Sequence, residues 1–227
     1  MLSGQVYANV EFDLTYEGSK SMNKQGLREF KKEATAHALA EAAFQLTLER
    51  GIDGFVVDDV VQTAGYSRRT FANYYSCKEE AIAMSAVPYH GTEEFIDLVN
   101  RLPENTSPLE LVHHLTKMQL AGDVIHKMRR LVELSKKHPT LEPYTLSVIY
   151  GLQTKAQNLL DDLFREQYAT GFIHFLVGAA YAAIHPLLDG SAHVRLPGQP
   201  VDEMPDAISF DEYIDTAFGY LRNGFQI

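Results

Sequence analysis

The stretch that decides the fold is VVDDVVQTAGYSRRTFANYYSCKEE, residues 56–80. Val57, Val60 and Val61 recur at i, i+3 and i+4, the spacing of an apolar stripe on one face of a helix. Gly65 follows the last residue of this run and suits the left-handed conformation that ends many helices. The stretch therefore begins with a short helix that ends at a glycine turn.

A second helix is predicted directly after this turn. Ser67 is a favourable N-cap, because its hydroxyl can accept a hydrogen bond from a main-chain N–H of the first helical turn. We expect Phe71, Tyr74 and Tyr75 to pack inward and four other residues to face solvent, namely Arg68, Arg69, Ala72 and Asn73. Two short helices joined by a glycine turn, the second with a basic outer face, are typical of a helix-turn-helix.

The sequence around this motif resembles the TetR family of bacterial transcriptional regulators. Upstream, LAEAAFQLTLERG (residues 39–51) is similar to the family's first helix, and KEEA (residues 78–81) is similar to the start of its fourth. The sequence departs from the family pattern at Val56, Tyr66, Ala72 and Cys77. The resemblance implies an all-α fold. An N-terminal three-helix helix-turn-helix DNA-binding module (24–90) would precede a C-terminal helical ligand-binding and dimerisation domain (91–227).

The resemblance also implies which residues contact DNA. Arg68 and Arg69 occupy the first turn of the second helix, where the major groove is closest, and either can pair with guanine. Arg69 and Asn73 are four apart and share a face, so they are the preferred base readers. Contacts to phosphate are expected from Ser67, Thr70, Tyr74, Lys78, Lys24 and Arg28.

The implied target is a palindromic operator in double-stranded DNA. One recognition helix covers only a few base pairs, so a homodimer is expected to read two half-sites about 34–36 Å apart. The C-terminal helices are expected to form the dimer contact. We expect a repressor, because a dimer bound over a promoter excludes polymerase.

Composition and charge agree with a cytoplasmic regulator. The 227 residues are 45% hydrophobic and 22% charged, as in ordinary globular proteins. The single cysteine permits no internal disulfide, and no basic segment with a following apolar run opens the chain, so we expect no signal peptide. The net charge of −10 divides into −2 for residues 1–23, −1 for residues 24–90 and −7 for residues 91–227. The acidity thus lies mostly outside the motif.

Periodicity predicts helices through most of the chain. The predicted helices cover about residues 25–50, 78–87, 95–102, 108–121, 123–137, 141–165, 167–188 and a last one from 209. Three capping boxes mark helix starts, at Ser76–Glu79, Ser107–Glu110 and Ser209–Glu212. The Gly-, Pro- and Asp-rich segment 189–206 is predicted to be a surface loop.

Two segments need separate interpretations. Apolar residues alternate over residues 6–16 with the period of a strand, so residues 1–23 are either a disordered extension or a docked arm. Met22 is an alternative start.

Residues 172–188 form an apolar run that is slightly short for a membrane span and contains two histidines and a proline. We expect a helix in a core or a dimer interface and no membrane partner.

Regulatory input is expected in residues 91–227. In the family, a ligand in the C-terminal helices shifts the spacing of the two DNA-binding heads, and here we expect an unknown small hydrophobic effector. The candidate lining residues are Met118, Met128, Tyr144, Tyr150, His174, Phe175 and Tyr181.

His113 and His114 point to different helix faces because they are adjacent, so no metal site is expected. No cofactor is expected.

Alternative functions remain. No phosphate loop, dinucleotide turn or nucleophile elbow occurs, so we expect no enzyme. Ala72, Val56 and the acidic charge leave open a helical ligand-binding or scaffolding protein whose DNA head has lost its function. Cys77 precedes a lysine at a predicted helix start, which leaves open a thiol-based sensor.

Overall fold

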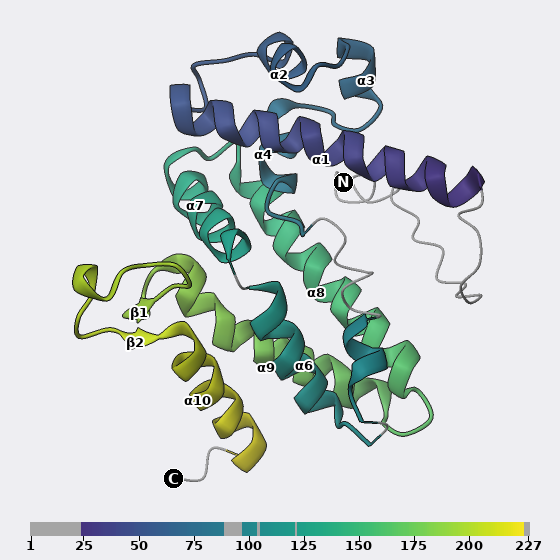
Figure 1. Cartoon of the computed structure of the whole chain (residues 1–227), viewed down its shortest axis with the longest axis vertical. Helices are drawn as coiled ribbons and strands as arrows, with labels where there is room; N and C mark the ends of the chain where they lie inside the picture. The colour runs from purple at the N-terminus through teal and green to yellow at the C-terminus, as the bar shows by residue number, and fades with distance from the viewer. Residues whose placement is uncertain (1–23, 89–96, 104, 121, 225–227) are drawn as a thin grey trace. The chain divides into compact units, whose positions relative to one another are not determined.

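The structure, a computed structural model, describes residues 24–88, 97–103, 105–120 and 122–224 (Figure 1). The chain divides into two compact units, residues 1–32 and 33–227, and the boundary falls inside the first helix, α1 (Lys24–Arg50). In the first unit, the described part is the opening turns of α1. The predicted arm over residues 1–23 lies outside the described residues. The predicted domain boundary at residue 90 stays a prediction.

Three short helices follow α1 and share a core with it. They are α2 (Val57–Ala64), α3 (Arg68–Ala72) and α4 (Lys78–Met84). The apolar side chains that meet in this core are buried, among them Leu39, Leu46, Ile52, Val60, Phe71 and Ile82. The hydroxyl of Tyr75 donates to the Ala36 carbonyl of α1 at 2.8 Å, and burial raises the pKa of Tyr75. The predicted inward packing of Phe71 and Tyr75 is confirmed, and Tyr74 is half-buried.

The turn between α1 and α2 is closed by a glycine and a lysine. The main chain at Gly54 passes so near α1 that an added Cβ would lie 2.1 Å from the Arg50 carbonyl oxygen. From the start of α4, Lys78 Nζ donates to the carbonyls of Ile52 at 2.6 Å and Phe55 at 2.8 Å. The turn therefore has one fixed shape.

The start of α4 differs from the prediction by one residue. Cys77, not Ser76, is the N-cap, and its sulfur accepts from the Glu80 N–H at 3.5 Å. The Glu80 carboxylate accepts from the main-chain N–H and the hydroxyl of Ser76, both at 2.6 Å. The sequence offers two successive glutamates, and the second one reaches back, so the predicted partner Glu79 was wrong.

Five longer helices make up most of the described C-terminal part. They are α6 (Pro108–Gln119), α7 (Asp123–Lys137), α8 (Glu142–Phe164), α9 (Thr170–Asp189) and α10 (Phe210–Asn223). α8 packs against α9, α7 against both, and α10 against α6 and α9, while α4 of the first group packs against α8. Their bounds agree with the predicted ones within three residues. The all-α prediction is confirmed.

The N-caps at Ser107 and Ser209 are also confirmed. The Ser107 hydroxyl accepts from the Glu110 N–H at 3.3 Å, and the Glu110 carboxylate accepts from the Ser107 N–H at 3.0 Å. The Ser209 hydroxyl accepts from the Glu212 N–H at 3.2 Å, which is one half of the predicted capping box; the reciprocal bond to the Glu212 carboxylate is not formed among the described residues. Each cap satisfies a main-chain donor that has no partner within its helix.

The segment between α9 and α10 is more ordered than a plain loop. Its short strand β1 (Val194–Arg195) pairs in parallel with β2 (Ile208–Ser209), and the 3-10 turn η1 (Val201–Glu203) lies between them. The segment predicted as a surface loop therefore contains a two-residue strand and a 3-10 turn, and part of it is buried. Val194 and Leu196 are buried, and this burial fixes the segment on the helices although its composition has no helical period.

α9 combines an apolar composition with a partly exposed surface. The stretch Gly171–Asp189 is long and apolar enough to cross a membrane, but one such helix is weak evidence, because core helices of soluble proteins pass the same test. Only 33% of the stretch is buried. Exposed and half-buried positions recur at spacings of three and four, at Gly171, Phe175, Gly178, Ala182 and His185. We call this row the α9 stripe.

Candidate functional site

The predicted helix-turn-helix is formed by α2, a glycine turn and α3. Gly65 has φ +74° and ψ +28°, the left-handed conformation that the sequence predicted, and the Tyr66 N–H donates to the Val61 carbonyl at 2.9 Å. The Ser67 hydroxyl then accepts from the Thr70 N–H at 3.0 Å and so caps α3. α2 and α3 are in contact, which fixes the direction of α3.

The outer face of α3 is exposed and basic. Arg68, Arg69, Ala72 and Asn73 are all exposed, as predicted. Arg68 contacts Asp58 of α2 through one nitrogen, with Nη1 3.1 Å from both carboxylate oxygens. Both partners of this ion pair face solvent, so it contributes little to stability. A competing phosphate can replace Asp58, whereas Arg69 extends from α3 without such a contact in any described residue.

The structure places the predicted phosphate contacts in different surroundings. Ser67 is exposed and Thr70 and Tyr74 are half-buried at the same end of α3, but Lys78 already donates to two main-chain carbonyls and lies 4.9 Å from the centre of the Phe55 ring. Arg28 is exposed on α1 in the 1–32 unit. The side chain of Lys24 lies outside the described residues. Ser67, Thr70 and Tyr74 thus lie on or next to the same short helix as Arg69 and Asn73, the two residues predicted to read bases.

Two acidic residues of α2 have roles that the sequence analysis missed. Asp58 holds Arg68, and the Asp59 carboxylate accepts from the Val56 N–H at 2.8 Å. The second role has a sequence signal, because an acidic residue three positions after an N-cap is half of a capping box. Val56 has no side-chain oxygen to cap the helix, so Asp59 carries this function alone. The Asp58 contact has no such signal, since it depends on the angle between two helices.

A comparison with solved structures bears on this architecture. No family model and no curated protein sequence matches the chain. A crystal structure from Mesorhizobium loti, provisionally assigned to the TetR family of transcriptional regulators, superposes with a TM-score of 0.53. The match covers 87% of this chain and 99% of that chain at 12% sequence identity. The chain has the fold of a TetR-family regulator.

A second similar structure is a transcriptional regulator from Rhodococcus sp. Rha1. It has 15% sequence identity and a TM-score of 0.47, and the match covers 85% of this chain and 98% of that chain. The TetR fold assigned from the first comparison agrees with the sequence resemblance over residues 39–81. It also extends that resemblance to helices whose sequences carry no motif.

A cavity lies among α6, α7, α8 and α9, within the C-terminal part of this TetR fold. Its volume is about 110 Å³, and its wall is mostly apolar side chains such as Leu120, Leu160 and Val177. Lys155 is the charged side chain of the wall among the described residues. Burial lowers the pKa of Lys155, and Glu33 acts in the opposite direction. This half-buried ammonium places one positive charge in a mostly apolar wall.

Two of the predicted ligand residues line this cavity, namely Met128 and Tyr181. Burial raises the pKa of Tyr181 and keeps its phenol neutral. The other five lie elsewhere, with Met118 half-buried on α6, Tyr150, His174 and Phe175 exposed on α8 and α9, and Tyr144 on the side of α8 that faces α4. Lys155 was missed, because a lysine in an ordinary amphipathic helix gives no sequence signal of burial.

Two polar contacts join the helix-turn-helix module to the C-terminal helices. Tyr144 hydrogen-bonds to Cys77, and this contact raises the pKa of Tyr144 to about 12. The Lys127 ammonium of α7 pairs with the Glu41 carboxylate of α1. The two contacts connect α8 and α7, which both line the cavity, to α4 and α1 of the helix-turn-helix module. His113 and His114 lie apart from both, with His113 half-buried and His114 exposed, as predicted.

Proposed function

We propose that this chain is a sequence-specific DNA-binding transcriptional regulator of the TetR type. The observation that carries the proposal is α3, which is capped by Ser67, held by the Gly65 turn and presents exposed Arg69 and Asn73 on one face. Arginine pairs with guanine and asparagine with adenine in the major groove. The proposed role is repression at a palindromic operator.

The proposed dimer contact is the α9 stripe with the neighbouring face of α8. Phe175 is 81% exposed and Tyr150 of α8 is 65% exposed, and α8 and α9 pack side by side. Large exposed apolar patches mark contact sites in soluble proteins. Gly178 and Ala182 have small side chains that permit close approach of a second helix. A two-fold dimer through this face would give the two recognition helices that a palindrome requires.

The proposed effector is a small hydrophobic molecule that binds in the cavity beside Met128 and Tyr181. A cavity of about 110 Å³ must widen to hold most ligands, so occupation would move α7 or α8. Those helices carry the contacts to Glu41 and Cys77 of the DNA-reading module. A ligand that prefers the widened state would therefore shift the population away from the DNA-competent arrangement.

Selection from random duplex DNA, followed by sequencing, tests the proposal at low and moderate salt. An enriched palindrome with half-sites about one helical turn apart supports a dimeric regulator. The absence of enrichment, for a folded and dimeric protein, supports instead the alternative of a helical binding protein with an idle DNA head. Because affinity from phosphate contacts falls steeply with salt, enrichment that persists at moderate salt indicates base reading.

Two substitutions then separate base reading from charge alone. Arg69→Ala should weaken binding to the enriched operator by roughly 5- to 150-fold, the loss of one bidentate base contact, and should relax the preference at one base pair of each half-site. The control is Arg165→Ala, which removes the same charge from an exposed position after α8. Equal losses for the two variants would reject base reading by Arg69.

A further inference from the structure

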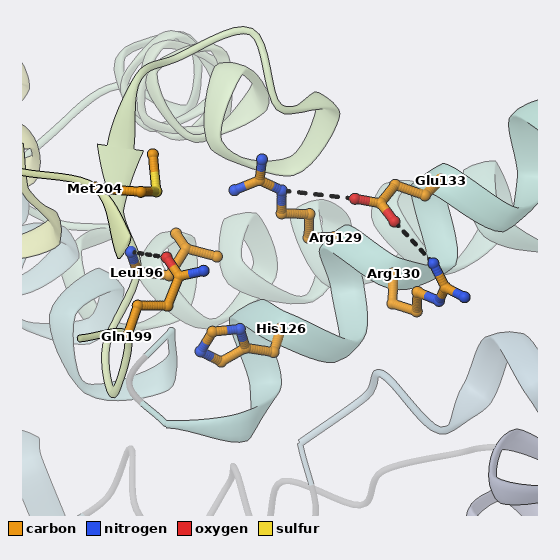
Figure 2. Close-up of a pocket in the computed structure, with 7 residues that line it drawn as sticks. All are labelled: His126, Arg129, Arg130, Glu133, Leu196, Gln199 and Met204. Atoms are coloured by element: carbon orange, nitrogen blue, oxygen red, sulfur yellow. Dashed lines mark hydrogen bonds and ion pairs between the residues drawn. The ribbon is translucent and has the colours of Figure 1, made fainter. Parts of the chain in front are cut away.

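A second hollow lies outside the core cavity, between α7 and the segment that joins α9 to α10. Its volume is about 310 Å³, and Figure 2 shows its lining residues. His126, Arg129 and Arg130 project from α7, and Leu196 and Met204 come from the joining segment opposite. This volume is at the lower end of the range of small-molecule sites, ~300–1,000 Å³. The hollow therefore combines cationic side chains with a short apolar wall.

The charges in this hollow are not matched one to one. Arg130 Nη1 donates to the Glu133 carboxylate at 3.1 Å, whereas Arg129 Nε stays 3.8 Å from the other oxygen of the same group. Arg130 lies on the far side of Glu133 from Leu196, and the Arg129 guanidinium lies on the near side (Figure 2). Two guanidinium groups thus share one carboxylate. Arg129, which lies nearer to the hollow, therefore keeps a net positive charge towards it.

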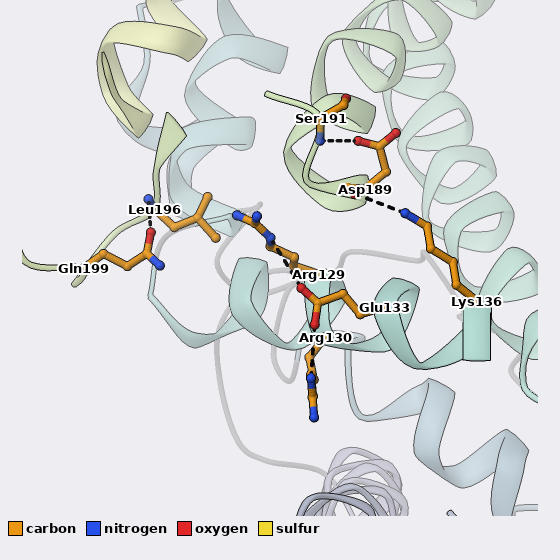
Figure 3. A network of polar contacts seen from close by, with 8 residues as sticks. All are labelled: Arg129, Arg130, Glu133, Lys136, Asp189, Ser191, Leu196 and Gln199. Atoms are coloured by element: carbon orange, nitrogen blue, oxygen red, sulfur yellow. Dashed lines mark hydrogen bonds and ion pairs between the residues drawn. The ribbon is translucent and has the colours of Figure 1, made fainter. Parts of the chain in front are cut away.

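The Arg129 side chain lies close to the main chain of a neighbouring element, at Gly190. Its side chain is only 26% exposed, and its Nη2 lies 3.1 Å from the position that a Cβ on Gly190 would occupy. Gly190 has φ +79°, so a side chain is disfavoured there in any case. The nearby Asp189 is already engaged, because its carboxylate accepts from the Ser191 N–H at 2.8 Å (Figure 3).

The polar groups of the joining segment complete the arrangement. His126 Nε2 donates to the Pro197 carbonyl at 2.7 Å, since a carbonyl oxygen can only accept. The Gln199 side-chain oxygen accepts from the Leu196 N–H at 2.7 Å, so the other end of this amide, its NH₂, is the end that can donate to a ligand in the hollow. Arg195 donates to the Met204 carbonyl at 3.3 Å and braces the wall. These hydrogen bonds tie the joining segment to α7 and to itself along the rim of the hollow.

We propose that this hollow binds a small organic anion, with a carboxylate or phosphate head at Arg129 and an apolar body against Leu196 and Met204. The planar guanidinium fork matches both head groups and can donate two parallel hydrogen bonds. Gln199 supplies a further donor, and Glu133 lies closer to Arg130 than to Arg129, so its competition for Arg129 is weakened but not removed. The ligand would bridge α7 and the joining segment, and the site is separate from the apolar cavity in the core.

Isothermal titration calorimetry on the full chain tests the proposal with four probes. Benzoate and phenyl phosphate present the two heads on one apolar body, inorganic phosphate lacks the body, and benzamide is a neutral match for benzoate. The expected result is binding of one anion per chain by benzoate or phenyl phosphate, at least roughly tenfold tighter than benzamide or inorganic phosphate. The tighter binder of benzoate and phenyl phosphate shows whether the site prefers a carboxylate or a phosphate head group. Equal affinity for benzamide, or no binding of either organic anion, would overturn the proposal.

Three variants sharpen the test. Arg129→Gln should lower the affinity for the anion by roughly tenfold or more. Glu133→Gln should raise it, because it removes the competing carboxylate, a gain that a purely structural role does not predict. The control is Lys137→Gln, which removes one positive charge from α7, as Arg129→Gln does, but outside the hollow. It should leave the affinity for the anion unchanged. If Arg129→Gln fails to fold, the sign of the Glu133→Gln effect alone decides, and a loss or no change rejects the site.

One further measurement guards against a trivial charge effect. Duplex DNA of unrelated sequence should not displace the bound anion. If DNA displaces the anion from the unaltered chain but not from Arg130→Gln, these arginines bind the phosphate backbone of nucleic acid. That result would overturn the small-ligand site.

Discussion

The helix-turn-helix module (residues 33–86) and the C-terminal helices (residues 108–223) fill space in different ways. At Gly54 of the module, the main chain of α1 occupies the position of a side chain, and the Lys78 ammonium fills the same turn from α4. In the C-terminal helices, Gly178 faces open space, Phe175 is 81% exposed and a cavity remains among the helices. The module is thus complete within one chain, whereas the C-terminal helices keep an apolar face and internal space that a partner and a ligand can use.

The sharpest test of this contrast is a glycine substitution in the module. Gly54→Ala should destabilise the chain by about 2–3 kcal/mol, because the new Cβ meets the Arg50 carbonyl oxygen and neither main chain can move without disturbing α1 or α2. Urea unfolding followed by circular dichroism measures the change.

The matched substitution is Gly178→Ala in α9, where nothing described lies within 4 Å of the new Cβ. It should stabilise the isolated chain by ~0.5–1 kcal/mol through the lower entropy of the unfolded state. A cost at Gly178 equal to that at Gly54 would break the contrast between the two regions.

The second expected effect is on association. Phe175→Glu places a charge in the α9 stripe and should raise the dissociation constant of the dimer by roughly 30-fold or more, about 2 kcal/mol, as at other interface hot spots. Sedimentation equilibrium measures it. The helicity of the monomer should be unchanged, because the side chain is already in water in the single chain. An unaltered dimer would remove the α9 stripe from the interface.

The third effect concerns the core cavity. Ala156→Leu should fill part of the space among α6, α7, α8 and α9 and change the stability of the chain by ~1 kcal/mol or less in either direction. It should also abolish the response of DNA binding to a hydrophobic effector while the operator is still bound. Fluorescence anisotropy with labelled operator, with and without effector, separates the two results. A retained response would place the effector elsewhere.

The smallest effect is a dependence of stability on pH at the contact of α6 with α10. Burial lowers the pKa of His113, although the Asp215 carboxylate, 2.8 Å away, opposes this shift. The unfolded chain therefore binds a proton more readily than the folded one, and His113 reduces stability as the pH falls below about 6.5. His113→Asn should flatten the decline between pH 7 and pH 5 by less than ~1 kcal/mol. Urea unfolding at pH 7 and at pH 5 measures the change.

The sequence alone was sufficient for the local structure of the module and for the order of the helices. Gly65, Ser67 and the valines of α2 act over a few residues, and the conformations they favour are the ones observed. The caps at Ser107 and Ser209 followed from spacing for the same reason. The cap of α4 was misplaced because two glutamates compete for one N–H, and only the fold selects Glu80.

Tertiary structure decided which side chains meet across helices. The Asp58–Arg68 pair, the half-buried position of Lys155 and the contact of Tyr144 with Cys77 each depend on angles between helices that no local pattern specifies. The same holds for Arg129, which reaches Gly190 from a different helix. Periodicity identifies the apolar face of α9, but only the packed chain shows that Phe175 remains in water while Val177 is buried. Local hydrogen bonds and helical spacing are encoded in neighbouring residues, whereas cavities, exposed faces and charge pairs depend on contacts between residues far apart in the chain.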